Sequence, residues 1–532
     1  MNKQYRLSEY ELRLKNRNLL VSAAFAEDLP VLKLSFDSRD VSDGTLFFCK
    51  GAGFKPEYAM AAKEKGAIAF VCDESNANVF CGGNAVTSDD GTALLQNENV
   101  FVVNDIRRAM AELSAMFNAY PWREFPLIGI TGTKGKSTTL AYLKSIMNAA
   151  RVCGEGKFGY ISTIDTYDGR EYFESHLTTP EAIELGMRLR NIADSELYAA
   201  AMEVSSQALK YHRTYGVEFD TAVFTNFGLD HIGSTEHPDI EDYLQSKLKI
   251  LNQSKNAVVN LDTDRAEDVM AAAMEGTIRS GGDLITFARD AGGADYTISN
   301  VRKEKGKTVF ELSGDKLGGS SVSGSAKSVG TMTLQLSMPG LFNVYNAAAA
   351  AIIALRLGAT PEEIREGLLT AKAAGRCEAY EDKEREIVVI SDYAHNALSF
   401  EALCRSVKEE YPGYRIEAVY GASGGKGYSR RSELPRIAAQ YADFSWITED
   451  DPGMEDPAEI CQEVYANLGS FGGMGKIEVD RQKAITEAVT GAPPKTAILL
   501  LAKGNDSYMI RGREYVPIKS DSELAKELTQ RH

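Results

Sequence analysis

The sequence lacks the marks of several large protein classes. Its seven cysteines are scattered without a Cys-x-x-Cys pair, so we expect reduced core thiols and no zinc or disulfide framework. Residues 1–6 form no apolar signal core, and no stretch approaches ~18 uninterrupted apolar residues. No repeat of about 20 to 50 residues is evident. We therefore expect a cytoplasmic protein that does not insert into a membrane.

The sequence also contains fewer basic than acidic residues. The chain has 59 Lys and Arg against 75 Asp and Glu, a formal net charge of −16. This balance disfavours nonspecific binding to nucleic acid or to anionic membranes, although it leaves room for a local basic pocket. A hydrophobic content of 44% is that of an ordinary globular protein. At 532 residues, the chain is longer than one hydrophobic core usually supports, which favours three domains.

Strand and helix patterns alternate along the chain and predict an α/β protein with three units. Their expected boundaries are 1–120, 121–374 and 375–532. The first is a small α/β unit, the second has a mostly parallel sheet and the third is a Rossmann-like α/β unit. The strongest strand candidates are 45–49, 67–71, 198–202, 221–225, 257–260, 387–390, 415–420, 444–448 and 497–501. We expect the Gly/Ser-rich stretch 313–331 to be a mobile surface hairpin or insertion without chemistry.

The clearest motif is a glycine-rich turn between a buried strand at 125–130 and a helix with one apolar face from 138. Such a turn lets backbone N–H groups surround phosphate oxygens at the positive end of a helix. Lys136 would neutralise the terminal phosphates, and Ser137 would place its hydroxyl on Mg²⁺. The spacing is a variant of G-x-x-x-x-G-K-[ST], because Ile130 stands five positions before Gly135. A glycine-rich turn without function is the alternative.

A second group of polar residues follows the predicted strand 198–202. Glu203 stands at its carboxyl end, where open α/β sheets collect ligand-binding groups, and a carboxylate there can hold Mg²⁺. His231, beside Asp230, is a candidate second ligand or an orienting group. A lone histidine is otherwise a surface residue or a satisfied core residue.

These motifs together resemble the Mur ligases, most closely the MurE type, the UDP-N-acetylmuramoyl-dipeptide:amino acid ligases. The resemblance covers essentially the whole chain, and its motifs occur in the family's order. They are Asp37-Ser38-Arg39, Thr131-Gly132-Thr133-x-Gly135-Lys136-Ser137-Thr138, Glu203-Val204-Ser205-Ser206, Thr225-Asn226, Asp230-His231, Tyr243-x-x-x-Lys247, Gly340-x-x-Asn343-x-x-Asn346, Gly375-Arg376-x-Glu378 and Asp392-Tyr393-Ala394-His395.

The resemblance implies an ATP-dependent ligase of peptidoglycan precursor synthesis, and hence of cell wall formation, cell shape and division. ATP would phosphorylate the carboxylate of the growing peptide, and the amine of an amino acid would attack the acyl phosphate. Such chemistry depends on positioning and charge neutralisation. The implied catalytic residues are Lys136, Lys247 and His231, with Ser137, Glu203, His231 and Lys247 around Mg²⁺. Lys247 matches the lysine that the family carboxylates with CO₂, which requires an uncharged amine; a helix-surface lysine beside Lys249 is the alternative.

The resemblance also assigns the three units and their binding residues. The first unit would bind UDP, the second ATP and the third the amino acid, and closure of the domains is expected. For ATP the implied residues are Gly132, Thr133, Lys134, Gly135, Lys136, Ser137, Thr138, Asn343, Asn346, Arg376, Asp392 and His395. For the UDP-muramoyl-peptide they are Ser38, Thr178, Thr179, Ser205 and Arg213. Thr179 as a helix N-cap and Arg213 as a surface cation are the alternatives, and Tyr211 replaces a glutamine often found in the family.

The expected amino-acid pocket contains Asp450, Asp451, Lys503 and Asp506. Family members that add meso-diaminopimelate carry Asp-Asn-Pro-Arg, whereas this chain has Asp450-Asp451-Pro452-Gly453. Without that arginine and with an extra carboxylate, the pocket should prefer a distal ammonium group, so we expect L-lysine or another cationic amino acid. Lys134, where the family usually has Asn, and a changed Gly-Lys-Gly-His-Glu motif at 502–506 leave a divergent paralogue open.

Two other functions remain alternatives at this stage. A polyglutamate or folylpolyglutamate synthetase would share the phosphate loop and Lys247 without needing the unit around Asp37-Ser38-Arg39. A regulatory protein that binds ATP or hydrolyses it slowly would need only the loop. For the ligase, the expected partners are UDP-N-acetylmuramoyl-L-Ala-D-Glu, ATP, Mg²⁺ and a free amino acid, with no nucleic acid, and the protein is expected to be a monomer.

Overall fold

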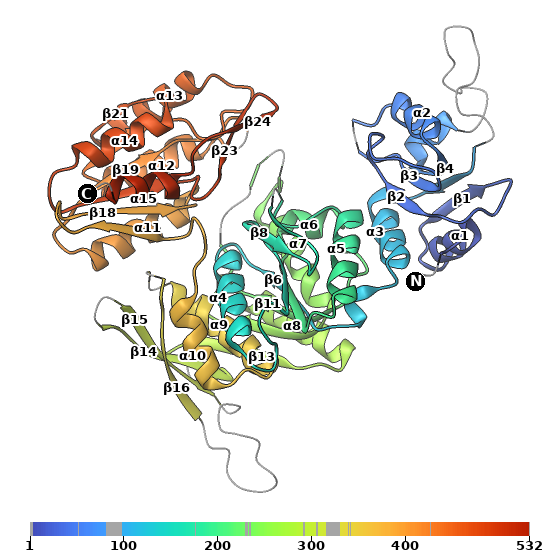
Figure 1. Cartoon of the computed structure of the whole chain (residues 1–532), viewed down its shortest axis with the longest axis horizontal. Coiled ribbons are helices and arrows are strands. Elements are labelled where there is room, and N and C mark those ends of the chain that lie inside the picture. Colours follow the sequence, from blue (N-terminus) through green and yellow to red (C-terminus); the bar gives the residue numbers. More distant parts are fainter. Residues whose placement is uncertain are drawn as a thin grey trace, which may run out of the picture.

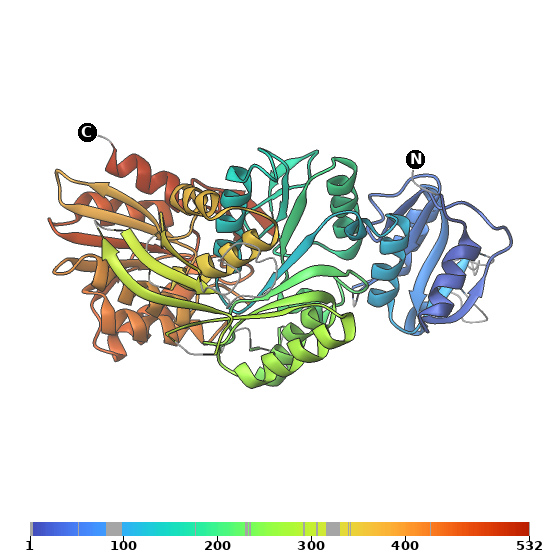
Figure 2. The same ribbon diagram turned by 90° about the horizontal axis from the view of Figure 1, so that it is seen from below.

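The computed structural model describes residues 4–51, 53–80, 98–175, 177–228, 232–233, 236–290, 293–304, 307–314, 330–338, 340, 342–425 and 427–530. This part of the chain forms three large sheets and one two-stranded ribbon. The N-terminal and C-terminal units lie at opposite ends of the molecule, with the central unit between them (Figures 1 and 2). The expected α/β class is confirmed, since parallel pairs predominate in each of the large sheets.

The N-terminal unit is built on a five-stranded sheet in the order β1-β5-β4-β3-β2. Both faces are covered: Phe101 and Val103 pack into one apolar cluster, while Val100 and Val102 pack into the other, as the alternation of side chains along a strand requires. Its elements are α1 (Leu7–Asn16), β1 (Leu20–Ala24), β2 (Lys33–Ser35), β3 (Thr45–Phe48), α2 (Pro56–Glu64), β4 (Ala67–Asp73), η1 (Glu74–Val79), β5 (Val100–Val103) and α3 (Ile106–Phe117).

The central unit contains an eleven-stranded sheet in the order β16-β15-β14-β13-β12-β11-β6-β10-β7-β8-β9. Its strands are β6 (Leu127–Thr131), β7 (Phe158–Ile161), β8 (Asp165–Tyr167), β9 (Tyr172–Glu174), β10 (Ala199–Glu203), β11 (Phe219–Phe224), β12 (Ser254–Asn260), β13 (Leu284–Arg289), β14 (Tyr296–Glu304), β15 (Lys307–Gly314) and β16 (Gly330–Gln335). Its helices are η2 (Pro121–Arg123), α4 (Lys136–Ala149), α5 (Ala182–Asp194), α6 (Ser206–Lys210), α7 (Ile240–Asn252), α8 (Ala266–Ser280), α9 (Asn343–Arg356) and α10 (Pro361–Thr370).

The middle of this sheet places the phosphate-loop strand at a topological switch point. Strand β6 pairs in parallel with β10 on one side and with β11 on the other. The chain first runs to β7 and β10 and then crosses β6 to reach β11. Ligands of open α/β sheets bind in the crevice that such a crossing leaves at the carboxyl ends of the strands. The loop that follows β6 therefore lies where a ligand site is expected.

The C-terminal unit has a six-stranded sheet in the order β17-β18-β22-β19-β20-β21, in which β17 is antiparallel to its neighbour. Its elements are β17 (Glu378–Asp382), β18 (Ile387–Asp392), α11 (Ala397–Glu410), β19 (Arg415–Tyr420), α12 (Arg430–Tyr441), β20 (Phe444–Ile447), α13 (Pro457–Ser470), β21 (Gly475–Ile477), α14 (Arg481–Gly491), β22 (Thr496–Leu501) and α15 (Asp521–Thr529). Strands β23 (Tyr508–Arg511) and β24 (Glu514–Pro517) form the separate ribbon.

Several sequence expectations are tested by these units. The six cysteines in the described ranges are buried and unpaired, as expected for core thiols, whereas Cys81 lies outside them. Of the stretch 313–331, residues 315–329 lie outside the described ranges, and the flanking residues pair as the ends of β15 and β16. Among the helices of the described segments, none has the length and apolarity required to cross a bilayer. The expected unit boundaries at 120 and 374 stay predictions.

Candidate functional site

The glycine-rich turn leads directly from β6 into α4, as its motif predicts. Gly132 has φ +149°, and a Cβ there would lie 1.9 Å from Thr225 Oγ1, so the turn requires glycine. Gly135 is the N-cap of α4 with φ +83°. The N–H groups of the first helical turn have no acceptor within the helix and carry its positive dipole end. They border a cavity of about 140 Å³, the loop cavity, lined by Thr133, Lys134, Gly135, Lys136, Ser137, Thr138, Thr163, Thr178, Glu203, Arg376, Tyr393 and His395.

Two lysines from different helices converge on the carbonyl oxygen of Gly132. Lys136 Nζ donates to it at 2.9 Å, and Lys247 Nζ donates to it at 2.8 Å. Lys247 is 1% exposed, and its ammonium lies 4.7 Å from the centre of the Tyr243 ring. The alternative of a helix-surface position for Lys247 is therefore wrong. Both amino groups are held at the back of the phosphate loop.

Ser137 and Glu203 are brought together beneath the loop cavity. Ser137 Oγ donates to Glu203 Oε2 at 3.0 Å. The fully buried Glu203 also accepts from the backbone N–H and the hydroxyl of Thr163, at 2.9 and 3.0 Å. These contacts are hydrogen bonds, and Glu203 forms no ion pair with a described residue. A buried carboxylate beside a hydroxyl, facing a cavity that also exposes helix N–H groups, fits a hard divalent cation whose other ligands are phosphate oxygens.

The remaining predicted metal ligand cannot be placed. His231 and its neighbour Asp230 lie outside the described residues, so the predicted roles of His231 as catalytic residue and ligand stay predictions. Within the described ranges, no group of three or more His, Cys, Asp and Glu is arranged to hold a metal by itself. A cation at Ser137 and Glu203 would accordingly depend on oxygens from the bound substrates.

A larger cavity of about 370 Å³, the nucleotide cavity, opens from the phosphate loop between the central and C-terminal units. Asn343 and Asn346 line it, and Asn346 Nδ2 donates to Asn343 Oδ1 at 3.0 Å. Its other lining residues are Thr133, Lys134, Gly135, Thr138, Asn226, Phe227, Gly228, Asn260, Asp262, Met338, Phe342, Tyr345, Arg376, Cys377, Asp392, Leu398, Ser399, Ala402 and Leu403. The lining thus combines apolar side chains with polar groups that could orient a bound small molecule.

Asp392 is fixed in this cavity by Cys377, a residue that the sequence did not single out. The backbone N–H and the thiol of Cys377 both donate to Asp392 Oδ2, at 2.8 and 3.3 Å. Burial raises the pKa of Asp392 above its ordinary value, although the Arg376 guanidinium opposes this shift. Arg376 lies 4.7 Å from the centre of the Tyr393 ring, and its Nη2 donates to Ser137 Oγ at 3.4 Å. His395 Nδ1 lies 2.8 Å from the carbonyl oxygen of Tyr393.

A cavity of about 170 Å³, the peptide cavity, lies on the other side of Lys136 and Lys247. It is lined by Lys136, Leu177, Thr178, Ser205, Ser206, Gln207, Arg213, Glu236 and Lys247. Thr178, Ser205 and Arg213, which are predicted to bind the UDP-muramoyl-peptide, line this cavity, whereas Thr179 does not. Its side chain is fully buried, donates to the Glu203 carbonyl at 2.9 Å and accepts from the Ser205 N–H at 3.1 Å.

The Thr179 hydroxyl is thus bound to backbone groups and holds the end of β10, and the predicted contact of Thr179 with the substrate stays a prediction. The N-cap alternative for Thr179 is wrong, since Glu181 precedes the first residue of α5. Ser205 caps α6 through Ala208 N–H and still borders the peptide cavity. Arg213 is no free surface cation: its Nη1 donates to the Thr179 carbonyl at 3.1 Å.

The N-terminal unit carries its own cavity of about 470 Å³, the N-terminal cavity, at the carboxyl ends of β2 and β3. Ser38, whose predicted contact with the UDP-muramoyl-peptide stays a prediction, lines it, and the aromatic residues among its lining offer stacking faces for a planar ring. The lining residues are Phe36, Asp37, Ser38, Arg39, Phe47, Lys50, Gly53, Phe54 and Tyr58.

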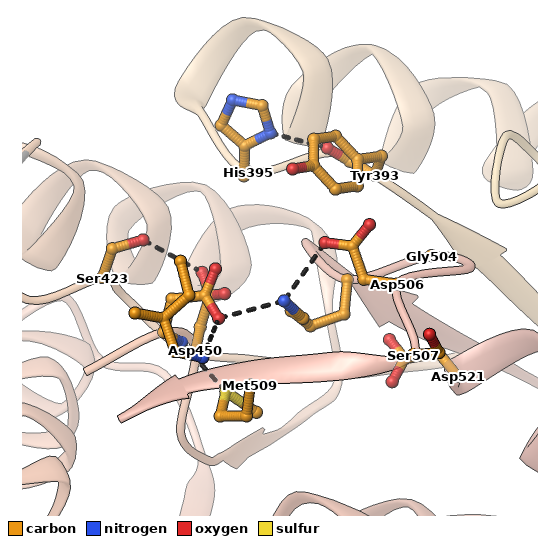
Figure 3. Close-up of polar contacts among 12 residues, drawn as sticks. Tyr393, His395, Ser423, Asp450, Gly504, Asp506, Ser507, Met509 and Asp521 are labelled. Atoms are coloured by element: carbon orange, nitrogen blue, oxygen red, sulfur yellow. Dashed lines mark hydrogen bonds and ion pairs between the residues drawn. The ribbon is translucent and has the colours of Figure 1, made fainter. Parts of the chain in front are cut away.

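An acidic cluster lies at the carboxyl ends of the C-terminal strands (Figure 3). Lys503, 1% exposed, forms ion pairs with Asp451 at 3.0 Å and Asp506 at 3.1 Å. Asp450 is the third carboxylate of the cluster, and Tyr393 lies above Asp506 (Figure 3). Burial raises the pKa of Asp506 to about 6, although Lys503 opposes the shift. Three carboxylates around one ammonium leave an excess of negative charge. The sequence did not reveal that Asp451 already has a cationic partner within the protein, the ammonium group of Lys503.

Comparison with known proteins identifies the family. The model of the Mur ligase middle domain matches residues 130–354, and that of the Mur ligase, glutamate ligase domain matches residues 375–504. A UDP-N-acetylmuramyl-tripeptide synthetase of Lactobacillus delbrueckii subsp. bulgaricus is 36% identical over 98% of each chain. The chain belongs to the Mur ligase family, MurE type. Mur ligases of this type use ATP and Mg²⁺ and form an amide bond.

Other known proteins are similar to this chain in sequence or in fold. The UDP-N-acetylmuramoyl-L-alanyl-D-glutamate--L-lysine ligase of Enterococcus faecalis is 34% identical over 93% of this chain and 91% of its own. A solved UDP-N-acetylmuramoyl-L-alanyl-D-glutamate--2,6-diaminopimelate ligase shares the fold over 100% of both chains, with a TM-score of 0.62 and 21% identity. Folylpolyglutamate synthase of Mycobacterium tuberculosis shares the fold over 74% of this chain and 92% of its own, with a TM-score of 0.57 and 16% identity.

Sequence reasoning also missed charged residues that connect the units. Lys50 lines the N-terminal cavity, and Glu181 lies between it and Arg213. Glu174 of β9 accepts from the Ser507 hydroxyl of the C-terminal unit at 3.3 Å. The sequence signal for two of these residues is position, because Glu174 is the last residue of β9 and Lys50 follows the end of β3 by two residues. Their contacts join different units, which local patterns do not report.

The raised pKa of Asp506 predicts how the acidic cluster responds to pH. Above pH 6 its carboxylate is charged, and below pH 6 it gains a proton, so the cluster loses negative charge on acidification. With L-lysine as a probe, we expect the apparent dissociation constant to rise as pH falls through 6, by up to about tenfold per pH unit. Calorimetry from pH 5 to 8 measures this. Asp506→Asn should bind weakly with a flat profile; the same pH dependence in that variant would contradict the assignment to Asp506.

Proposed function

We propose that this Mur ligase adds L-lysine to UDP-N-acetylmuramoyl-L-Ala-D-Glu, with ATP converted to ADP and phosphate. The observation that carries the choice of amino acid is the acidic cluster, whose carboxylates exceed its cations. A cationic side chain is attracted to such a pocket, whereas a distal carboxylate is repelled. At the position of the diaminopimelate-binding arginine stands Gly453, where a Cβ would meet nothing closer than Gly424 O at 3.9 Å. The L-lysine ligase of Enterococcus faecalis, a relative at 34% identity, supports the same choice.

The cavities suggest how the substrates are arranged. The uridine would lie in the aromatic N-terminal cavity and the dipeptide in the peptide cavity, with the adenosine in the nucleotide cavity and the triphosphate on the first turn of α4. Lys136 would exchange the Gly132 carbonyl for the γ-phosphate, because a helix N-terminus and a lysine together stabilise a phosphoryl group. Arg213 offers a guanidinium to a peptide carboxylate.

The reaction then needs two displacements. The side-chain carboxylate of D-Glu attacks the γ-phosphorus, which forms an acyl phosphate and releases ADP. The lysine α-amine attacks the acyl carbon, loses a proton and expels phosphate, which leaves an amide. Ser137 and Glu203 would hold Mg²⁺, which neutralises phosphate charge when bound. Closure of the two units around the reacting groups would exclude water, which would otherwise hydrolyse the acyl phosphate.

We also propose that Lys247 is carboxylated. Lys136 and Lys247 donate to the same carbonyl oxygen, and two ammonium groups so placed disfavour each other's charge. A neutral Lys247 amine that attacks CO₂ and releases a proton becomes a carbamate. The pair of like charges would thereby be replaced by an attractive pair, and the carbamate would offer an anionic oxygen ligand to Mg²⁺. This modification, like the monomeric state and the role of His231, stays a prediction.

An amino-acid panel tests the proposed substrate. ADP release and product mass are measured with ATP, Mg²⁺, UDP-N-acetylmuramoyl-L-Ala-D-Glu and L-lysine, L-ornithine, meso-diaminopimelate or L-glutamate. We expect L-lysine to exceed meso-diaminopimelate in kcat/KM by roughly 100-fold or more, because an uncompensated carboxylate in the pocket costs several kcal/mol. Use of diaminopimelate with lysine ignored would refute the proposal. ADP release that is independent of both acceptor substrates would favour the nucleotide-binding regulator.

Asp451→Asn tests whether the acidic cluster binds the amino acid, since it removes one carboxylate of the cluster. We expect Asp451→Asn to raise the KM for L-lysine. The control is Asp456→Asn, which removes the same charge at the exposed N-cap of α13 and keeps a good capping residue. This control should behave as wild type. Equal effects of the two substitutions would point to net charge and not to the pocket.

Chemical rescue tests the carbamate. Lys247→Ala should lower kcat roughly 100-fold, as removal of one preorganised charged group typically does, and a short carboxylic acid such as acetate should restore part of the activity. Lys249→Ala, two residues further along α7 and half-buried, is the matched control and should keep wild-type turnover. Unchanged turnover in Lys247→Ala, or rescue equally strong in wild type, would remove the carbamate from the mechanism.

A further inference from the structure

A single carboxylate joins the N-terminal cavity to the peptide cavity. Glu181 Oε2 forms an ion pair with Lys50 of the N-terminal unit. Its other oxygen, Oε1, lies 3.0 Å from Nε of Arg213. Lys50 lines the N-terminal cavity, and Arg213 lines the peptide cavity. The two cavities are therefore connected through a chain of three charged side chains that crosses from one unit to the other.

These three side chains are largely withdrawn from water. Their exposed fractions are 9% for Lys50, 19% for Glu181 and 15% for Arg213. Ion pairs at such burial hold a defined geometry better than exposed ones, because solvent screens them less. Lys50 is fixed further by the Phe36 ring, whose centre lies 4.6 Å from its ammonium. This series of three charged side chains is thus suited to fix the distance between the two cavities.

The charges around Glu181 are unbalanced. Burial tends to raise the pKa of Glu181, but Lys50, Arg213 and Arg107 together hold that pKa below its ordinary value. For Lys50, burial lowers the pKa, and the charges of Arg107 and Arg213 lower it further against the opposing effect of Glu181. One carboxylate thus interacts electrostatically with three cations. The positive charge left over is complementary to an anionic ligand that passes between the cavities.

The side chain of Glu181 does not stabilise the N-terminus of α5, the helix that it precedes. It is the N-cap of α5, yet its side chain makes no capping hydrogen bond. Ser, Thr, Asp and Asn are the residues that normally stabilise this position. The next residue, Ala182, is buried in the apolar core of the N-terminal unit, and its carbonyl accepts from Ser114 Oγ at 2.8 Å. Glu181 therefore stands at the joint between the units, with its carboxylate directed to the two cations.

We infer that Glu181 is a positioning residue that holds Lys50 and Arg213 at a fixed separation, so that one nucleotide-sugar substrate is gripped at both ends at once. This inference rests on the proposed substrate, which has a nucleotide at one end and a peptide at the other. Binding of one end places the other at a high effective concentration only if the two cavities keep a matching distance. Without the carboxylate, each cavity keeps its own contacts, but their separation is no longer fixed.

Glu181→Gln tests the inference, because it keeps the size of the side chain and removes its charge. We expect the dissociation constant of UDP-N-acetylmuramoyl-L-Ala-D-Glu to rise about tenfold or more through loss of effective concentration. The dissociation constants of UDP alone and of N-acetylmuramoyl-L-Ala-D-Glu alone should change less than about twofold, and the KM for ATP should stay constant. A residue that only stabilises the fold would not separate the intact substrate from its two fragments.

The matched control is Glu184→Gln, one turn further along α5, where the carboxylate pairs with Arg188 of the same helix at 3.6 Å. It should bind the intact substrate as wild type does. Lys50→Gln removes the same contact from the other unit, and combined with Glu181→Gln it should show a clearly non-additive loss. A KM for ATP that stays constant in each variant shows that all members of the cycle are folded, as the cycle requires.

Three results would overturn the inference: an unchanged affinity for the intact substrate, an equal loss for UDP alone, or additive losses in the cycle. Failure of the proposed substrate is a separate outcome, because the wild-type protein would then not bind the intact nucleotide-sugar before any residue is changed.

Discussion

The close approach of the Gly132 turn to the end of β11 is the constraint on which the rest of the site depends. With φ +149° and Thr225 Oγ1 only 1.9 Å from where a Cβ would stand, this position excludes every side chain. The turn is locked there because the Thr133 N–H donates to the Asn226 carbonyl at 2.9 Å. Its outer side presents the start of α4 to the loop cavity, while the Gly132 carbonyl on its inner side receives Lys136 and Lys247.

Two local clusters of opposite charge lie apart in the molecule, although its net charge is strongly negative. Lys50, Arg107 and Arg213 share one carboxylate at the joint of the N-terminal and central units, whereas Asp450, Asp451 and Asp506 surround Lys503 in the C-terminal unit. An anionic nucleotide-sugar and a cationic amino acid would thus approach the phosphate loop from different sides. Net charge alone, the quantity available from composition, gives no indication of this division.

The parts of the site that the sequence predicts are those set by local pattern. A buried strand followed by a glycine turn and a helix identifies the loop at Gly132, and the end of a predicted strand identifies Glu203. Packing decides the rest. The Thr179 hydroxyl is taken up by the backbone of β10, and Asp451 is paired by Lys503, which lies 52 residues away. The bridge at Glu181 needs two units to be docked, so no periodicity reports it.

Calorimetric titration with a non-hydrolysable ATP analogue and Mg²⁺ tests the role of the Gly132 turn most directly. Wild type should bind the analogue, and Gly132→Ala should weaken binding at least about 100-fold, equivalent to about 2.8 kcal/mol. Gly156→Ala is the matched control, because Gly156 also has a positive φ, of +69°, but has no atom within 4 Å of its Cβ position; it should bind as wild type does. Equal affinity of wild type and Gly132→Ala would contradict the account.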